Sequence, residues 1–126
     1  MRKLILATFL VTALSAAAAA QTPQNDIPNM GQAPKEMNGL GKMDARVFDQ
    51  AGNPVPGVFI RLESRRTDGY FCEAWNTSDE RGVAVLPALH MGRLRLIVKA
   101  KGYHDQKLEV SPSALGEPYR ITLTKK

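Results

Sequence analysis

Residues 45–58 have the sequence ARVFDQAGNPVPGV, in which a strand pattern is followed by turn residues and the start of a second strand. At its start, Ala45 and Val47 occupy one face and Arg46 and Phe48 the other, with the two-residue period of a strand. Residues 49–53 have turn chemistry, because Gly and Asn adopt positive φ at little cost. The PVPG segment that follows cannot donate regular ladder hydrogen bonds, so it is a rigid connection. The stretch therefore predicts two strands joined by a turn.

The same short alternation continues to the C-terminus. Short runs, most of them with apolar residues at every second position, mark candidate strands at residues 43–49, 58–63, 70–77, 83–86, 93–99, 107–110 and 120–124. About seven short strands at roughly 8–12-residue spacing are typical of an all-β sandwich. No stretch keeps a helical period over three turns. Outward positions are mainly Arg, Lys, Glu and Thr, which predicts antiparallel sheets with one face in water.

The N-terminus has the pattern of an export signal. A basic start, Met1-Arg2-Lys3, precedes the apolar run LILATFLVTAL and the alanine-rich segment SAAAAA. This is the three-part pattern of a Sec-type signal peptide, residues 1–20, with cleavage after Ala20. The apolar run is shorter than the roughly 20 residues that span a bilayer, so an uncleaved anchor is less favoured. We expect a bacterial protein that is secreted or periplasmic, with no membrane span after cleavage.

A polar segment separates the signal from the strands. Residues 21–41, QTPQNDIPNMGQAPKEMNGLG, are rich in Pro, Gly, Gln and Asn and have no hydrophobic period. Such a composition buries too little apolar area to offset its ordering entropy, which predicts a flexible leader. The folded domain is then expected at residues 42–126.

The net charge and the cysteine content limit the class of protein and its partners further. Loss of Arg2 and Lys3 leaves 15 basic residues against 12 acidic ones, a net charge of about +3. This is too mild and dispersed for a nucleic-acid binder, and export also argues against that partner. The single cysteine, Cys72, cannot form an internal disulfide. Its strand-like flanks favour burial as a small apolar residue over an intermolecular bridge.

Several motifs resemble those of carboxypeptidase regulatory-like domains. Residues 45–58 resemble the opening strand and the D-x-x-G-x-P-[VL]-x-G-[AV] element of that family. Residues 77–82 resemble its T-x-D-x-x-G turn, residues 86–92 its L-P-x-G connector with extra residues, and residues 98–103 its V-x-A-x-G-Y closing element. Together these cover nearly all of residues 42–126. The resemblance implies a transthyretin-like or prealbumin-like Greek-key sandwich, similar also to starch-binding-like modules, in a family whose members are seldom catalytic.

Enzymes that share this fold have catalytic residues that this chain lacks. Transthyretin-like hydrolases place a catalytic His in the first strand, where this chain has Arg46, and their Tyr-Arg-Gly-Ser tail is absent. Intradiol dioxygenases open with a similar hairpin but need two Tyr and two His on iron, whereas only His90 and His104 are present here. No Gly-x-Ser-x-Gly elbow occurs. The sequence predicts no enzyme activity, no cofactor and no metal site.

The candidate binding surface is formed by aromatic and basic residues, namely Arg61, Arg65, Arg66, Phe71 and Trp75. Phe71 and Trp75 have the same parity, so both lie on one face of their strand. If Cys72 and Ala74 point inward, the two aromatic rings are exposed; the opposite phase places Trp75 in the core. Exposed rings of this kind stack on sugars or anchor protein contacts.

The sequence thus predicts an exported, non-catalytic binding module, with an envelope glycan or a protein as its partner. The alternative is a structural component of a secreted or periplasmic assembly that pairs through an exposed sheet edge. A hydrolase of the transthyretin-like type is the least favoured interpretation.

Overall fold

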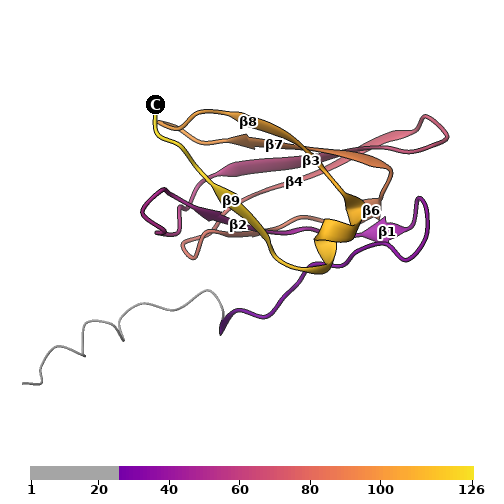
Figure 1. Ribbon diagram of the computed structural model, residues 1–126, viewed down its shortest axis with the longest axis horizontal. Helices are drawn as coiled ribbons and strands as arrows, with labels where there is room; N and C mark the ends of the chain where they lie inside the picture. The colour runs from indigo at the N-terminus through magenta and orange to yellow at the C-terminus, as the bar shows by residue number, and fades with distance from the viewer. Residues whose placement is uncertain (1–25) are drawn as a thin grey trace, which may run out of the picture.

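The computed structural model describes residues 26–126 and has an all-β architecture (Figure 1). The strands are β1 (Leu40–Gly41), β2 (Asp44–Phe48), β3 (Phe59–Arg65), β4 (Phe71–Thr77), β5 (Val83–Val85), β6 (Leu89–His90), β7 (Arg93–Lys99), β8 (Gln106–Val110) and β9 (Tyr119–Thr122). A 3₁₀ helix, Pro112–Gly116, precedes β9. Seven of these strands have three residues or more, so the prediction of a small all-β sandwich with about seven strands is confirmed.

Two sheets form the layers of the sandwich. The larger has the strand order β4-β3-β7-β8, the smaller the order β5-β2-β9, and β1 pairs with β6 at one end. All pairs in the larger sheet are antiparallel, whereas β2 and β9 are parallel. This parallel pair differs from the expected all-antiparallel arrangement.

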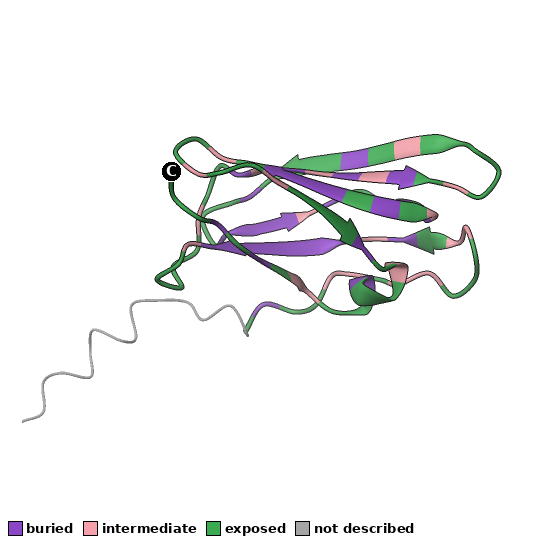
Figure 2. Ribbon diagram, turned by 45° about the horizontal axis from the view of Figure 1, so that its top comes forward, coloured by how far each residue is buried: buried purple, intermediate pink, exposed green. Residues whose placement is uncertain are grey.

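The core lies between the two sheets and is made of the inward side chains of both. In the larger sheet, Ile60, Leu62, Leu96 and Val98 are fully buried. Figure 2 shows the alternation of buried and exposed positions along the strands. The smaller sheet contributes Ala45 and Val47 together with other buried apolar residues. Burial of apolar surface at roughly 25 cal/mol per Å² is the main stabilising contribution in a chain with a single cysteine.

The central strand of the smaller sheet is buried on both faces. All five residues of β2 are buried, whereas the sequence predicted that Arg46 lies in the outward-facing basic set. The Arg46 side chain forms an ion pair with the fully buried Asp44, with 2.8 Å between Nη2 and Oδ2. The guanidinium of Arg120 covers the Phe48 ring, 3.8 Å from its centroid. The prediction that Arg46 belongs to the outward basic set was therefore wrong.

Part of the expected leader covers this face. Arg46 Nη2 donates to the carbonyl oxygens of Ile27 and Pro28, at 3.3 and 3.0 Å, and the N–H of Met30 donates to Asp44 Oδ2 at 3.0 Å. Ile27 is 93% buried, since its relative exposure is 7%. The segment then continues into β1. Residues 26–41 thus belong to the folded domain, in contrast to the expectation of a flexible leader up to Gly41, because the buried Asp44–Arg46 pair supplies polar partners that composition does not reveal.

The predicted signal peptide, residues 1–20, and its cleavage position after Ala20 lie outside the described residues. In the described part, residues 26–126, no helix has the length and apolar character needed to cross a membrane.

Candidate functional site

The outward face of the larger sheet carries the residues singled out by the sequence, and we call it the open face. By cross-strand register its side chains are Phe59, Arg61, Glu63, Arg65, Phe71, Glu73, Trp75, Thr77, Arg93, Arg95, Ile97, Lys99, Lys107 and Glu109. Among these, Ile97 is buried, with a relative exposure of 4%. Cross-strand register arranges them in rows. Trp75, Arg61, Ile97 and Lys107 form one row, and the next contains Glu73, Glu63, Arg95 and Glu109.

The phase of β4 places its aromatic side chains in solvent. Ala74 is buried and Cys72 is half-buried against the core, so Phe71 and Trp75 point outward. The relative exposure is 56% for Trp75 and 45% for Phe71. The Trp75 ring lies beside Phe59 on the neighbouring strand, with 5.9 Å between ring centroids. The two rings together form an exposed, apolar platform at one end of the open face.

Charged residues in the middle of the face are largely paired. Glu63 and Glu73 stand directly opposite each other, which is unfavourable for like charges. Arg61 relieves this repulsion, because its guanidinium lies 3.1 Å from Glu63 Oε2 and 3.8 Å from Glu73 Oε2. Arg61 therefore organises the face and is less available than an unpaired arginine to a ligand.

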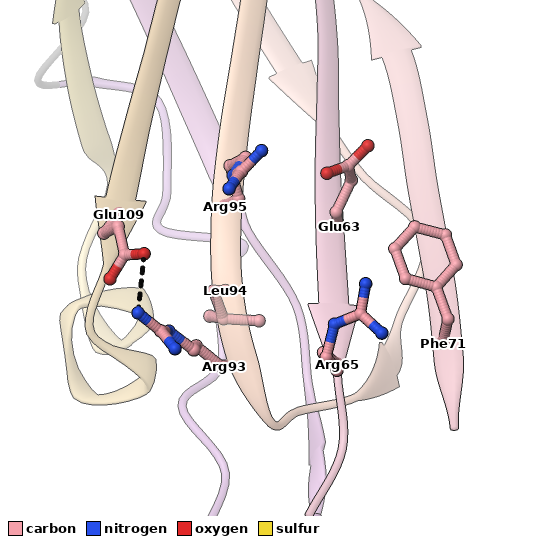
Figure 3. Close-up of a pocket in the computed structure, with 7 residues that line it drawn as sticks. All are labelled: Glu63, Arg65, Phe71, Arg93, Leu94, Arg95 and Glu109. Atoms are coloured by element: carbon pink, nitrogen blue, oxygen red, sulfur yellow. Dashed lines mark hydrogen bonds and ion pairs between the residues drawn. The ribbon is translucent and has the colours of Figure 1, made fainter. Parts of the chain in front are cut away.

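The other end of the face is hollowed. A shallow depression of about 210 Å³ is lined by Glu63, Arg65, Phe71, Arg93, Leu94, Arg95 and Glu109 (Figure 3). Arg93 is paired with Glu109 at 3.2 Å. The guanidinium of Arg65 lies over the Phe71 ring, 5.6 Å from its centroid. Arg65 and Arg93 occupy directly opposite positions on β3 and β7, so two positive charges meet at this end.

A buried hydroxyl fixes the backbone beneath this hollow. Ser64 is fully buried, its hydroxyl donates to the carbonyl of His90 at 2.9 Å, and it accepts from the N–H of Gly92 at 2.7 Å. The two backbones approach closely here, since a Cβ on Gly92 would lie 2.2 Å from the carbonyl oxygen of Arg65. Glycine at this position lets the start of β7 pack against the end of β3, which brings Arg65 and Arg93 together.

The remaining predicted residue, Arg66, lies beyond the sheet. It follows β3 in the hairpin loop, where its guanidinium pairs with Asp68 at 2.9 Å and lies 5.7 Å from the centroid of the Tyr70 ring. The same loop is joined to the N-terminal segment by a hydrogen bond from Asn38 to the Thr67 hydroxyl at 2.7 Å. The structure thus places Arg61, Arg65, Phe71 and Trp75 on one face, and Arg66 at its border.

The edges of the larger sheet are in contact with the smaller one. On β4, the side chain of Asn76 donates to the carbonyl of Val85 on β5 and accepts from the N–H of Thr77. On β8, the side chain of Gln106 donates to the carbonyl of Thr122 on β9. Side-chain cover of this kind hinders an incoming strand. These contacts favour the broad face over the edges as the interaction surface.

The two histidines lie at opposite ends of the sandwich. His90 is in β6, just before β7, and His104 lies in the turn after β7. The seven residues of β7 separate them by roughly 20 Å at about 3.3 Å per residue, so one ion cannot bind both. Within residues 26–126, no three His, Cys, Asp or Glu side chains converge on a point where a metal ion could be held.

Comparison with known proteins supports the fold and leaves the family open. No protein-family model matches the chain, and no curated protein matches it. Among solved structures, a 3-chlorocatechol 1,2-dioxygenase from Rhodococcus opacus 1CP superposes with a TM-score of 0.55 and 15% sequence identity. The match covers 75% of this chain and 64% of the dioxygenase chain. At this identity the likeness is one of fold alone, and it supports a β-sandwich.

Sequence reasoning left Arg95, Glu63 and Glu109 out of the candidate surface. Arg95 reaches the hollow because β3 pairs with β7, about thirty positions further along the chain, and that register is set by tertiary packing. The available signal was the alternation of Arg93 and Arg95 with buried leucines, which indicated an outward basic strand and no particular neighbour.

Proposed function

We propose that this protein is an exported, non-catalytic binding module of the carboxypeptidase regulatory-like type, and that its open face binds an envelope glycan. The observation that carries the proposal is the exposed Trp75–Phe59 platform, which lies on the same sheet face as Phe71 and several charged groups. Flat aromatic surfaces stack on the apolar faces of sugar rings, and neighbouring carboxylates and guanidinium groups hydrogen-bond to hydroxyls.

The composition of the face favours a glycan over a protein partner. The centres of protein interfaces are depleted in Lys, Glu and Asp. Here the aromatic platform lies among Glu63, Glu73, Lys99 and Lys107, all on the same face. A ligand rich in hydroxyl groups satisfies such residues without removing them all from water. The side-chain contacts of Asn76 and Gln106 argue against the alternative of pairing through a sheet edge.

Calorimetric titration of the mature protein with purified envelope polysaccharides tests the proposal. Trp75→Ala is expected to weaken binding about tenfold or more, because it removes the large apolar ring surface that a stacked sugar would cover. Tyr70→Ala is the matched control, because Tyr70 is a 68% exposed aromatic residue in the hairpin loop, outside the open face. Equal losses in the two variants, or no binding by the wild type, would contradict the proposal.

A further inference from the structure

Two arginines in the hollow of the open face form no ion pair in the described part of the chain, although Glu63 and Glu109 flank Arg95 on the adjacent strands. Arg61, Arg66, Arg81 and Arg93 each form an ion pair with a nearby carboxylate, and Arg46 is paired in the other sheet. Within residues 26–126, the guanidinium groups of Arg65 and Arg95 form neither an ion pair nor a hydrogen bond. Both line the same depression (Figure 3).

Their positions suit one small anion. Arg65 stands opposite Arg93, and Arg95 lies two residues further along β7, so Arg65 and Arg95 are diagonal neighbours on adjacent strands. Diagonal neighbours in a sheet lie about 7–8 Å apart, with their Cβ atoms somewhat closer, so two long side chains can reach one carboxylate between them. Arginine binds such groups through two parallel N–H donors.

The charge of the hollow selects the type of anion. Its lining contains the guanidinium groups of Arg65, Arg93 and Arg95 and the carboxylates of Glu63 and Glu109, a formal balance of one positive charge. A single negative charge neutralises this balance, whereas a phosphate dianion would exceed it by one negative charge beside the carboxylates of Glu63 and Glu109. The Phe71 ring, with Arg65 against it, adds an apolar wall to the site.

The volume of the hollow limits the size of the ligand group that it can hold. Its volume of about 210 Å³ is below the roughly 300–1,000 Å³ of pockets that enclose a drug-sized ligand. The site therefore fits a single charged unit of a longer chain that lies across the face.

We infer that the hollow recognises the carboxylate of a uronic acid unit, held between Arg65 and Arg95 with its sugar ring against Phe71. This inference rests on the proposed function, because the rest of the chain is taken to run across the sheet toward Trp75. The open face is then specific for acidic glycans over neutral ones.

The test compares two probes with the same sugar backbone, oligogalacturonate and its fully methyl-esterified form. Wild-type protein is expected to bind the acid at least tenfold more tightly than the ester, by calorimetric titration. Arg65→Gln and Arg95→Gln are each expected to weaken binding of the acid about tenfold and to leave binding of the ester unchanged. Arg120→Gln, the same change on the other sheet, is expected to alter neither.

The outcomes separate this inference from the proposed function. Equal binding of acid and ester, with both lost in Trp75→Ala, overturns the carboxylate site and leaves the proposed function standing. Loss of acid binding in Arg65→Gln but not in Trp75→Ala supports the anion site and overturns the aromatic platform. If Arg120→Gln weakens binding of the acid as much as Arg65→Gln does, the attraction is diffuse electrostatics, and the carboxylate site is overturned. If the protein binds neither probe, the carboxylate site is overturned. If it also binds none of the purified polysaccharides, the proposed function is overturned as well.

Discussion

The two sheets of this sandwich use arginine in opposite ways. On the smaller sheet, Arg46 is buried, pairs with Asp44 and donates to backbone carbonyls of the N-terminal segment, so that face is closed by the chain itself. On the larger sheet, Arg65 and Arg95 lie in an exposed hollow beside Phe71 and form no ion pair in the described chain. The same residue type thus closes one face by pairing within the chain and remains exposed on the other.

The largest effect is expected on the closed face. Arg46→Ala leaves the carboxylate of Asp44 buried without its counter-ion, which typically costs about 3–5 kcal/mol in the free energy of unfolding. Urea denaturation measures this loss, and limited proteolysis is expected to cleave within residues 26–41 more rapidly. A loss below about 1 kcal/mol would mean that the N-terminal segment does not depend on this pair.

A smaller effect is expected beneath the open face. Ser64→Ala removes the hydroxyl that joins the His90 carbonyl to the Gly92 N–H. The Gly92 N–H then loses its acceptor, and the His90 carbonyl keeps only the weaker contact from the Cys72 Sγ at 3.8 Å. Unsatisfied buried groups cost about 1–3 kcal/mol each, so we expect a loss of about 2 kcal/mol by thermal or urea unfolding. Cys72→Ser, a change of one atom at a half-buried neighbour, is the control and should cost less. Wild-type stability in Ser64→Ala would contradict the role assigned to this hydroxyl.

The exposed ion pair of the open face is expected to contribute less. Arg93→Ala breaks the ion pair with Glu109. The side chain of Arg93 is 77% exposed and that of Glu109 is 62% exposed. Exposed pairs typically contribute about 0.2–1 kcal/mol, so the unfolding midpoint should change little. This variant is the direct counterpart of Arg46→Ala. Similar losses in the two would remove the distinction between a closed and an open face.

The smallest effect concerns Asp79, in the turn between β4 and β5. Partial burial alone would raise the pKa of this carboxyl, but hydrogen bonds from the Arg81 side chain and from the N–H groups of Val83 and Arg81 outweigh it and lower the pKa. A lowered folded-state pKa contributes stability above the unfolded value of about 3.9, and this stability is lost as pH falls through the folded pKa. Asp79→Asn is expected to flatten the acid limb of the stability curve slightly, and an unchanged acid limb would contradict the assignment.

The strands could be predicted from the sequence, but the burial of Arg46 on the smaller sheet could not. Seven short segments predicted the strands. Most of them have apolar residues at every second position, because each strand turns one apolar face to the core. The same rule failed at Arg46, since it assumes that every second residue of a strand meets water. Residues 26–30 cover that face through hydrogen bonds to backbone carbonyls and to Asp44, which leave no hydrophobic pattern.

The candidate site was predicted in part for a similar reason. Arg61, Arg65, Phe71 and Trp75 lie on adjacent strands of a local hairpin, β3 and β4, so their common face follows from parity once the phase is known. The phase itself depends on whether Ala74 or Trp75 packs against the core, and sequence left this open. The pairing of β3 with β7 brings Arg95 into the hollow, and it is set by long-range packing.

Fluorescence quenching of Trp75 shows whether a glycan bound to the protein covers the open face of the larger sheet. Trp75 is the only tryptophan in the chain and is 56% exposed, so acrylamide should quench its emission readily in the free protein. A saturating amount of an envelope glycan that binds the protein should then protect the ring and reduce the quenching constant severalfold. Unchanged quenching at saturation would place the ligand elsewhere and contradict the account.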